Sequence, residues 1–536
     1  MSGCEDEACV DVGKFGVNRS VARFLRLYCF VCLLSLTSGS TYGEKPARGA
    51  RDVSISMGRR GTIVSITPGR SRTSNVAGVS KPSYPFPRPR LAGFSPWIAI
   101  TTSDERRPIN QDDWAHYLHA SYVGNSLTGS ASTDFVLGIL DSGADVDLVA
   151  GSFAEVLGIT GPLLTNNVIQ IGGVGGFVDA YVTQPLAFFA AGLPSINEEG
   201  VLDLSAVRGH SNVSAIAAPP IDCGSGAVVS AVLGTPFIAF HNLHIRVDSP
   251  RTITKDGVTV QGPDVTIHDK FDDLPFYQHA IALDFGGPLL EVTTASYLPD
   301  FLNFDDQDSP VIPTLLSAFA FTQPTGGAFF TTILVLQGEP GPTNIVQSMR
   351  VLVDTGAQTS IMSEAMVAAL SLPNEPDFTV DACGVGGLVP GLAGYYVDYV
   401  KINARGGALE FSRAPFIVLD LPSAEGNTVI LDGILGMNFF WNRNITFEPS
   451  ITATGFLTVS EPIPFAAGDF DLNLSVDPND VAALVSCLTG PDGGQLSPDC
   501  EHIDIDQNGQ IGLYDFSLLQ NCYSGQEVAA DPSCGG

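Results

Sequence analysis

FVLGILDSGADVDLV, at Phe135–Val149, and RVLVDTGAQTSIM, at Arg350–Met362, follow the same pattern. In each stretch, an apolar run that is typical of a buried strand ends in Asp-Ser-Gly-Ala or Asp-Thr-Gly-Ala. One such tripeptide is weak evidence, because Asp and Gly both favour tight turns. Two copies, each at the end of a strand and each followed by Ala, indicate a duplicated unit with Asp141 and Asp354 in equivalent positions.

Two further pairs of segments repeat in the same order. The tetrapeptide Gly-Val-Gly-Gly begins 32 residues after Asp141 and 30 residues after Asp354. Two apolar residues and a glycine come later in each copy. An ordered set of matches at this spacing predicts an internal duplication. The segments are 173–176 and 384–387, then 232–234 and 434–436; the copies span 112–250 and 326–462, separated by a loop-rich insertion at 251–325.

The paired carboxylates suggest hydrolysis without a metal. Two close carboxyl groups cannot both ionise easily, so they share one proton. The charged partner can take a proton from water while the protonated partner polarises a peptide carbonyl. We expect Gly143 and Gly356 to permit the tight turn, and the hydroxyls of Ser142 and Thr355 to hold the carboxylates by hydrogen bonds.

With these motifs, the chain resembles the pepsin and retropepsin clan of aspartic peptidases. The resemblance implies a mainly β fold, a two-lobed β-barrel pseudo-dimer, with Asp141 and Asp354 as the catalytic dyad and a polypeptide substrate between the lobes. Asp147 departs from the pattern, since it stands where Ser or Thr is common and matches Ser360. The Gly-Val-Gly-Gly segments are similar to the flap of these enzymes, which assigns flap roles to Gly173, Gly175, Gly176, Gly384, Gly386 and Gly387.

A second, smaller repeat occupies the C-terminus with a period of 35 residues. An EF-hand-type loop takes oxygen ligands at positions 1, 3, 5, 7, 9 and 12, with Gly favoured at position 6. The second loop has Gly509 at position 6, whereas the first has Leu474, so we expect the first loop to be the weaker or more strained. The candidate ligands are Asp469, Asp471, Asn473, Ser475, Asp477 and Asp480, then Asp504, Asp506, Asn508, Gln510 and Asp515.

An amphipathic stretch follows each loop, and the pair resembles a type I dockerin over residues 466–536. This resemblance implies a small α-helical domain, Ca²⁺ as its cofactor and a cohesin-like protein partner. The in-phase cysteines suggest local disulfides Cys487–Cys500 and Cys522–Cys534. For Cys223 and Cys383, which could pair, we favour buried or unpaired thiols.

The net charge of −31 argues against nucleic-acid binding through phosphate contacts. Residues 44–111 are locally basic and predict a linker or a pro-segment over an acidic cleft. Before them, arginines precede the short apolar run 27–36, so residues 1–43 have the layout of a signal peptide. No later stretch is long and apolar enough for a membrane span. We therefore expect a protein that is secreted or associated with the cell surface.

The sequence as a whole predicts a secreted aspartic endopeptidase with a calcium-dependent docking tail. Two alternatives remain open: a catalytically silent peptide-binding protein of the same fold, or a surface structural protein attached through its tail. The presence of both Asp141 and Asp354 favours the peptidase.

Overall fold

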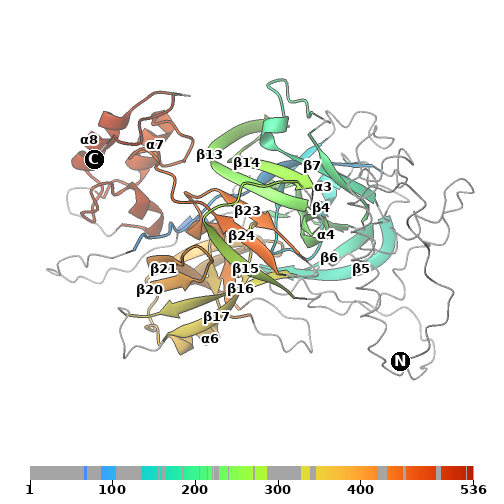
Figure 1. Cartoon of the computed structure of the whole chain (residues 1–536), viewed down its shortest axis with the longest axis horizontal. Helices are drawn as coiled ribbons and strands as arrows, with labels where there is room; N and C mark the ends of the chain where they lie inside the picture. Colours follow the sequence, from blue (N-terminus) through green and yellow to red (C-terminus); the bar gives the residue numbers. More distant parts are fainter. Residues whose placement is uncertain are drawn as a thin grey trace, which may run out of the picture. The chain divides into compact units, whose positions relative to one another are not determined.

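In the structure, a computed structural model, the chain divides into two units, residues 1–51 and residues 52–536. All residues described below belong to the second unit (Figure 1). They are 66–68, 86–103 and 135–534, without 155–156, 158, 160–163, 184–185, 204–205, 214, 220, 223–227, 240, 270–271, 287–327, 339–345, 421–430, 451–453, 490–495 and 527. The expected signal peptide, most of the basic segment and the second half of the insertion lie outside these residues.

The first lobe is built on a nine-stranded sheet. Its central strand β3 is buried along its whole length, as expected for a continuous apolar run with both faces covered. The strand order is β5 (Leu164–Gly173), β6 (Gly176–Thr183), β9 (Ile216–Ala218), β4 (Leu148–Ala150), β12 (Ala231–Leu233), β3 (Val136–Leu140), β2 (Trp97–Ser103), β7 (Leu186–Gly192) and β8 (Arg208–Val213).

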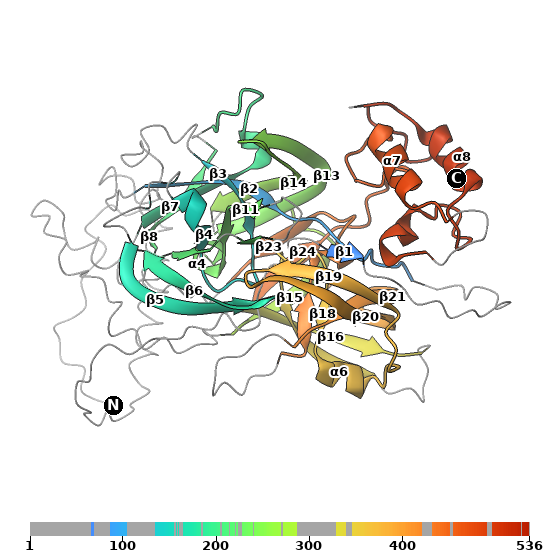
Figure 2. The same ribbon diagram turned by 180° about the vertical axis from the view of Figure 1, so that it is seen from behind.

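A thirteen-stranded sheet contains the second lobe and continues into strands shared with the first. Its order is β1 (Ile66–Pro68), β19 (Phe378–Gly384), β20 (Gly387–Ile402), β21 (Leu409–Val418), β18 (Ile361–Met362), β22 (Gly433–Leu435), β17 (Gln347–Val353), β16 (Ala328–Leu336), β15 (His279–Gly286), β24 (Gly455–Val459), β23 (Ile445–Glu448), β13 (His241–Lys255) and β14 (Val258–Asp269) (Figure 2). Strands β10 (Ile221–Asp222) and β11 (Val228–Val229) form a separate pair.

Helices are few and short, which agrees with the predicted mainly β fold. They are α3 (Gly151–Ala154), α4 (Thr235–Ile238), α6 (Glu364–Ala369), α7 (Pro478–Ser486) and α8 (Leu513–Cys522), with 3₁₀ turns η3 (Leu193–Ser195), η6 (Met437–Phe439) and η7 (Pro498–Ile503). Helix α6 begins after Ser363, whose hydroxyl accepts the N–H of Met366 as an N-cap. Among the described helices, none is long and apolar enough to cross a membrane.

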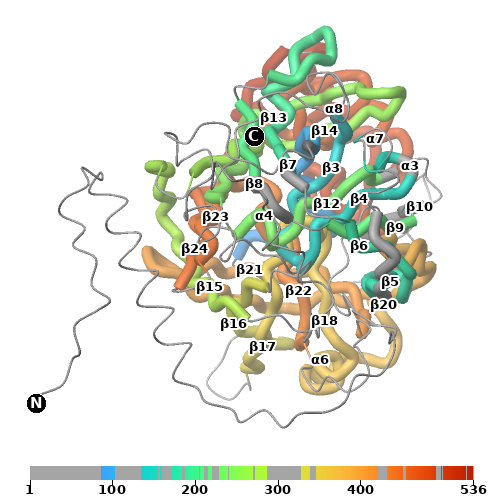
Figure 3. Tube along the Cα trace, turned by 90° about the vertical axis from the view of Figure 1, so that its right-hand side faces the viewer, coloured from blue at the N-terminus to red at the C-terminus, as the bar shows by residue number. Residues whose placement is uncertain are grey.

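The two lobes repeat the same strand pairings around their Asp motifs. In the first lobe, β12 runs parallel to β3 and antiparallel to β4. In the second, β22 runs parallel to β17 and antiparallel to β18. Figure 3 shows both groups of strands. The match confirms that the duplication read from the sequence is structural.

The lobes meet at β13 and β23, which pair in an antiparallel and self-equivalent way. Leu243 pairs with Phe447, His244 with Thr446, and Ile245 with Ile445. Leu243 and Ile445 each lie nine residues after the matched glycines Gly234 and Gly436, so they are equivalent in the repeat. The pairing therefore exchanges equivalent residues across a pseudo-two-fold axis. The side chain of Asn444 adds a contact between lobes, since its Oδ1 accepts the N–H of Val247 at 2.8 Å.

The lobe boundaries differ from the expected ones. Strand β2 pairs with β3 and β7, so the first lobe includes residues from the segment expected to be a linker. Strand β13 crosses the expected boundary at 250/251, and β14 and β15 follow it. The first part of the 251–325 insertion is thus β structure rather than loop, because its strands extend the sheet on which the two lobes meet.

Residues 86–95 form a strap on the second lobe, although they also belong to the expected linker. The carbonyl of Leu91 accepts the Thr359 hydroxyl at 2.6 Å, and the N–H of Gly93 donates to the carbonyl of Gln358 at 2.8 Å. Both partners lie in the loop that follows Asp354. The strap therefore supports the second Asp motif, and the expected boundary at residue 112 lies too late.

Candidate active site

Asp141 and Asp354 lie at equivalent positions, each one residue beyond a central strand, β3 or β17. Both side chains are buried, at 1% and 0% exposure. Oδ1 of Asp141 accepts the N–H groups of Gly143 and Ala144 at 2.8 and 3.0 Å. Oδ1 of Asp354 accepts those of Gly356 and Ala357 at the same two distances. Each carboxylate is thus held by its own turn.

The hydroxyls of Ser142 and Thr355 act differently from what the sequence suggested. The Ser142 hydroxyl donates to the carbonyl of Val353 and accepts the N–H of Thr355, at 2.8 and 3.1 Å. The Thr355 hydroxyl donates to the carbonyl of Leu140 and accepts the N–H of Ser142, at 2.8 and 3.0 Å. Each hydroxyl has one proton, which it gives to the opposite lobe's backbone. The expectation that they hold the carboxylates is wrong; they tie the two loops together.

Gly143 and Gly356 are required by a close approach between the lobes. A Cβ on Gly143 would lie 2.3 Å from the carboxyl carbon of Asp354. One on Gly356 would lie 2.4 Å from that of Asp141. Each carboxyl therefore packs on the glycine of the other motif. The structure brings all six predicted dyad and loop residues together.

The electrostatics of this pair favour a shared proton. Burial is the largest cause that raises the pKa of Asp354 well above its usual range, and the negative charge of Asp141 raises it further. The N–H groups of Gly356 and Ala357 oppose this shift only in part. A side-chain hydrogen bond with Asp141 raises the pKa of Asp354 as well. Burial and the neighbouring carboxylate thus favour the neutral form of the Asp354 carboxyl.

The six predicted flap glycines lie at two hairpin tips, β5–β6 and β19–β20, which meet each other. The N–H of Gly386 donates to the carbonyl of Val174 at 2.8 Å. A Cβ on Gly175 would lie 2.4 Å from the carbonyl carbon of Gly386, and a Cβ on Gly386 would lie 2.2 Å from that of Gly175. Only glycine allows the two backbones to approach this closely.

Each tip places its valine in the core of the opposite lobe. Val174, of the first lobe, is fully buried in a cluster with Ala357 and other residues of the second. Val385, of the second lobe, is 7% exposed in a cluster that contains Ala144 and other residues of the first. Neither valine belongs to the residues predicted for the flaps, although an apolar residue between glycines at a hairpin tip is a usable sequence signal. The exchange closes both hairpins over the region of the Asp motifs.

Cys383, next to the second tip, also lies in the first lobe's cluster. It is disulfide-bonded. The preference for an unpaired thiol was therefore wrong at this position, because spacing along the chain gave no measure of which cysteines the lobes bring together.

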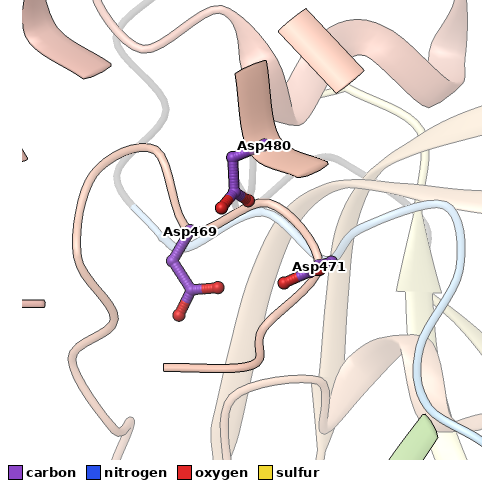
Figure 4. A group of neighbouring side chains, drawn as sticks. All are labelled: Asp469, Asp471 and Asp480. Carbon is purple, nitrogen blue, oxygen red and sulfur yellow. The ribbon is translucent and has the colours of Figure 1, made fainter. Parts of the chain in front are cut away.

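The C-terminal tail has two loops with the same internal geometry. Carboxylate oxygens of Asp469, Asp471 and Asp480 lie within 4.8 Å of one another (Figure 4), and so do those of the second loop's equivalents. Burial and the neighbouring carboxylates raise the pKa of Asp469 to about 7 and that of Asp471 to about 6. Hard oxygen donors crowded in this way suit Ca²⁺, which would offset their mutual repulsion. The second set is Asp504, Asp506 and Asp515.

The remaining candidate ligands support these loops by hydrogen bonds. Asn473 and Asn508 each donate a backbone N–H to the first aspartate of their loop, at 3.1 and 3.0 Å. At position 6, Leu474 has φ 71° and Gly509 has φ 85°. The left-handed backbone strains a leucine but not a glycine, so the expected strain in the first loop is confirmed. Oδ1 of Asn473 accepts the N–H of Ser475 at 2.7 Å, Oδ1 of Asp477 accepts that of Asn479 at 2.7 Å, and Oδ1 of Asn508 accepts that of Gln510 at 2.8 Å.

Helices α7 and α8 follow the two loops, and disulfides fasten the segments around them. The pairs Cys487–Cys500 and Cys522–Cys534 confirm the suggested connectivity, with Cα–Cα distances of 5.5 and 5.2 Å. The tail also contacts the lobes: Arg90 of the strap donates to the carbonyl of Phe470 at 3.0 Å. Arg413 pairs with Glu501 of the tail at 3.2 Å.

Comparison with known proteins finds similarity to aspartic proteases. Residues 342–439, which include Asp354 and the second hairpin tip, match the family model described as aspartyl protease. No curated protein matches the chain significantly. Among solved structures, an aspartic proteinase from Irpex lacteus aligns with 69% of this chain and 98% of its own, at 10% identity and a TM-score of 0.31. Similarity to the aspartyl protease family is thus shown over residues 342–439.

Proposed function

We propose that the chain is an aspartic endopeptidase whose dyad, Asp141 and Asp354, activates a water molecule against a peptide bond. Asp354 carries the shared proton and donates a hydrogen bond to the scissile carbonyl, which becomes more electrophilic. Asp141 accepts a proton from the attacking water. The observation that carries the proposal is the reciprocal packing of each carboxyl on the glycine of the other motif.

Hydrogen bonds between the Asp141 loop and the Asp354 loop hold the two carboxyls in place. The crossed hydrogen bonds of Ser142 and Thr355 keep the carboxyls in register while charge moves between them. Closed hairpin tips would exclude water and hold an extended peptide. This supports endopeptidase action on an unfolded or flexible segment of a polypeptide.

The test compares Asp141→Asn and Asp354→Asn with wild type on quenched-fluorescent peptides and a denatured protein, from acidic to neutral pH. Both substitutions keep the shape of the side chain but remove one titrating group, so each should lower kcat by 10³-fold or more, on the order of the loss of a catalytic group. Asp256→Asn, on an exposed turn, serves as the matched control. Equal cleavage by wild type and both dyad variants would favour a silent peptide-binding protein.

We also propose that the tail binds Ca²⁺ in a dockerin-like manner and docks to a cohesin-like protein. Asp469, Asp471 and Asp480 would hold one ion, and their equivalents the second. The test is thermal unfolding of the full chain with Ca²⁺ or with chelator. Asp480→Ala should abolish part of the calcium-dependent rise in melting temperature, whereas Asp531→Ala, outside the loops, should not. An unchanged calcium response in Asp480→Ala would refute the site.

We further propose export of the protein, in keeping with the signal-like N-terminus. Two disulfides in a compact tail support this, since such bonds persist in oxidising compartments. Detection of the chain outside expressing cells, with an N-terminus beyond residue 43, would test it; retention of residues 1–43 would contradict it.

A further inference from the structure

Asp147 is a fully buried carboxyl on the first catalytic loop, six residues after Asp141. Its Oδ1 accepts the N–H of Gly234 at 2.7 Å. Its Oδ2 is buried without a hydrogen-bond partner among the described residues. An acid in this setting is unusual, because a buried carboxylate without a cation loses the solvation that it had in water.

In the second lobe, a neutral side chain accepts the N–H of the equivalent glycine. There the hydroxyl of Ser360 accepts the N–H of Gly436 at 2.9 Å and donates to Oδ1 of Asn438 at 2.7 Å. The first lobe has Pro236 where the repeat places Asn438, so it has no amide side chain at this point. One carboxyl group replaces the serine–asparagine pair.

The peptide that Asp147 holds is attached to the backbone of the catalytic loop on both sides. The carbonyl of Leu233 accepts the N–H of Asp141 at 2.9 Å, and the N–H of Thr235 donates to the carbonyl of Ala144 at 2.8 Å. Gly234 lies between these two bonds. Resting on the peptidase function proposed above, we propose that Asp147 is a positioning residue that fixes the Asp141 loop through the Gly234 N–H.

Its surroundings favour the neutral acid. Burial raises the pKa of Asp147 to about 8, and only the backbone N–H groups of Gly234 and Phe237 oppose the shift. Strands β4, β9 and β12, which surround the loop, contain no ionisable side chain. The other ionisable side chains of this loop are those of Asp141 and Asp145. Asp354 lies on the facing motif, and the imidazole of His241 stacks on Phe237. None of the acids can supply a positive charge.

Protonation of Asp147 gives the folded protein a characteristic dependence of stability on pH. The folded protein keeps a proton on Asp147 up to about pH 8, whereas the unfolded chain loses it near the ordinary value of 3.8. The folded state is therefore destabilised progressively as pH rises between these values. Asp147→Asn imitates the neutral acid, retains an oxygen for the Gly234 N–H, and removes the titration. Asp147→Ala removes the acceptor as well.

The experiment measures thermal unfolding of the full chain from pH 4 to 9, and kcat and KM at pH 5. Relative to wild type, the melting temperature of Asp147→Asn should rise with pH, while kcat at pH 5 stays within about fivefold. Asp147→Ala should lower kcat by tenfold or more with KM within about twofold. Ser360→Ala, the matched change in the second lobe, should melt lower than wild type by the same amount at every pH.

Two results would overturn the inference. One is a melting difference between Asp147→Asn and wild type that is the same at pH 4.5 and pH 8. The other is a wild-type kcat in Asp147→Ala. If the wild-type chain cleaves no peptide, the proposed function fails, yet the unfolding measurement still decides whether Asp147 is protonated in the folded state.

Discussion

Replacing Gly386 by Ala should separate the two hairpin tips without unfolding the lobes. The new Cβ would lie 2.2 Å from the carbonyl carbon of Gly175, whereas non-bonded carbons prefer about 3.5–4.0 Å. The two backbones must therefore move apart by roughly 1 Å or more. This breaks the 2.8 Å bond from the Gly386 N–H to the carbonyl of Val174 and withdraws both tip valines from their pockets.

The size of the effect follows from these contacts. The lost hydrogen bond contributes about 1 kcal/mol net. Burial of a valine contributes about 1.5–3 kcal/mol, and a gap of 0.5–1 Å forfeits roughly a quarter to a half of the contact energy, for both Val174 and Val385. The closed state thus loses about 2–4 kcal/mol. If the transition state requires closed tips, kcat/KM falls by about 30- to 900-fold.

The assay is kcat/KM on a quenched-fluorescent peptide, with the melting temperature measured on the same samples. Gly151→Ala is the matched control, since the added Cβ meets the carbonyl oxygen of Ala218 at an ordinary 3.4 Å and no other non-adjacent group of the described residues within 4 Å. It reports the effect of a Gly-to-Ala change on the unfolded state, which is about 0.4–1 kcal/mol in the opposite direction. A folded Gly386→Ala protein with kcat/KM within threefold of the control would refute the reasoning.

Three further outcomes are expected. Gly356→Ala should abolish cleavage, since its Cβ would lie 2.4 Å from the Asp141 carboxyl carbon; activity above a tenth of wild type would contradict this close approach. A chain that begins at Phe86 should fold and cleave peptides, whereas one that begins at residue 96 should melt lower because Thr359 loses its partner on the strap; equal melting temperatures would contradict a structural strap. Because the pKa of Asp354 is raised in the folded state, the stability of the wild-type chain should fall as pH rises above about 4. The fall should be less steep in Asp354→Asn, and parallel pH profiles of melting temperature for the two proteins would exclude the raised pKa.

The sequence was sufficient to predict the duplicated unit and the residues of the dyad. Strand, Asp motif, Gly-Val-Gly-Gly and apolar-apolar-Gly recur in order, and these are local signals that survive without knowledge of contacts. The same holds for the tail, where loop spacing and cysteine phase predicted the acidic clusters and both disulfides.

The functions of individual hydroxyls and valines depended on tertiary structure. The hydroxyls of Ser142 and Thr355 bond to the opposite lobe, across 211 and 215 residues of chain. Val174 and Val385 each pack in the core of the opposite lobe, so these contacts also join segments that are far apart in the sequence. Periodicity reports only which face of an element is apolar, and says nothing of which lobe covers it.

The predicted lobe boundaries were wrong for a related reason. The basic composition of residues 44–111 and the turn-rich composition of 251–325 indicated linkers, yet strap, β2 and β13–β15 lie inside the folded unit. Composition reflects the average solvation of a segment, whereas hydrogen bonding to a sheet edge is decided by the partner strand. The sequence alone determined that two equivalent aspartates exist and where; only the folded chain determined that each packs on the other's glycine, because that contact belongs to neither copy by itself.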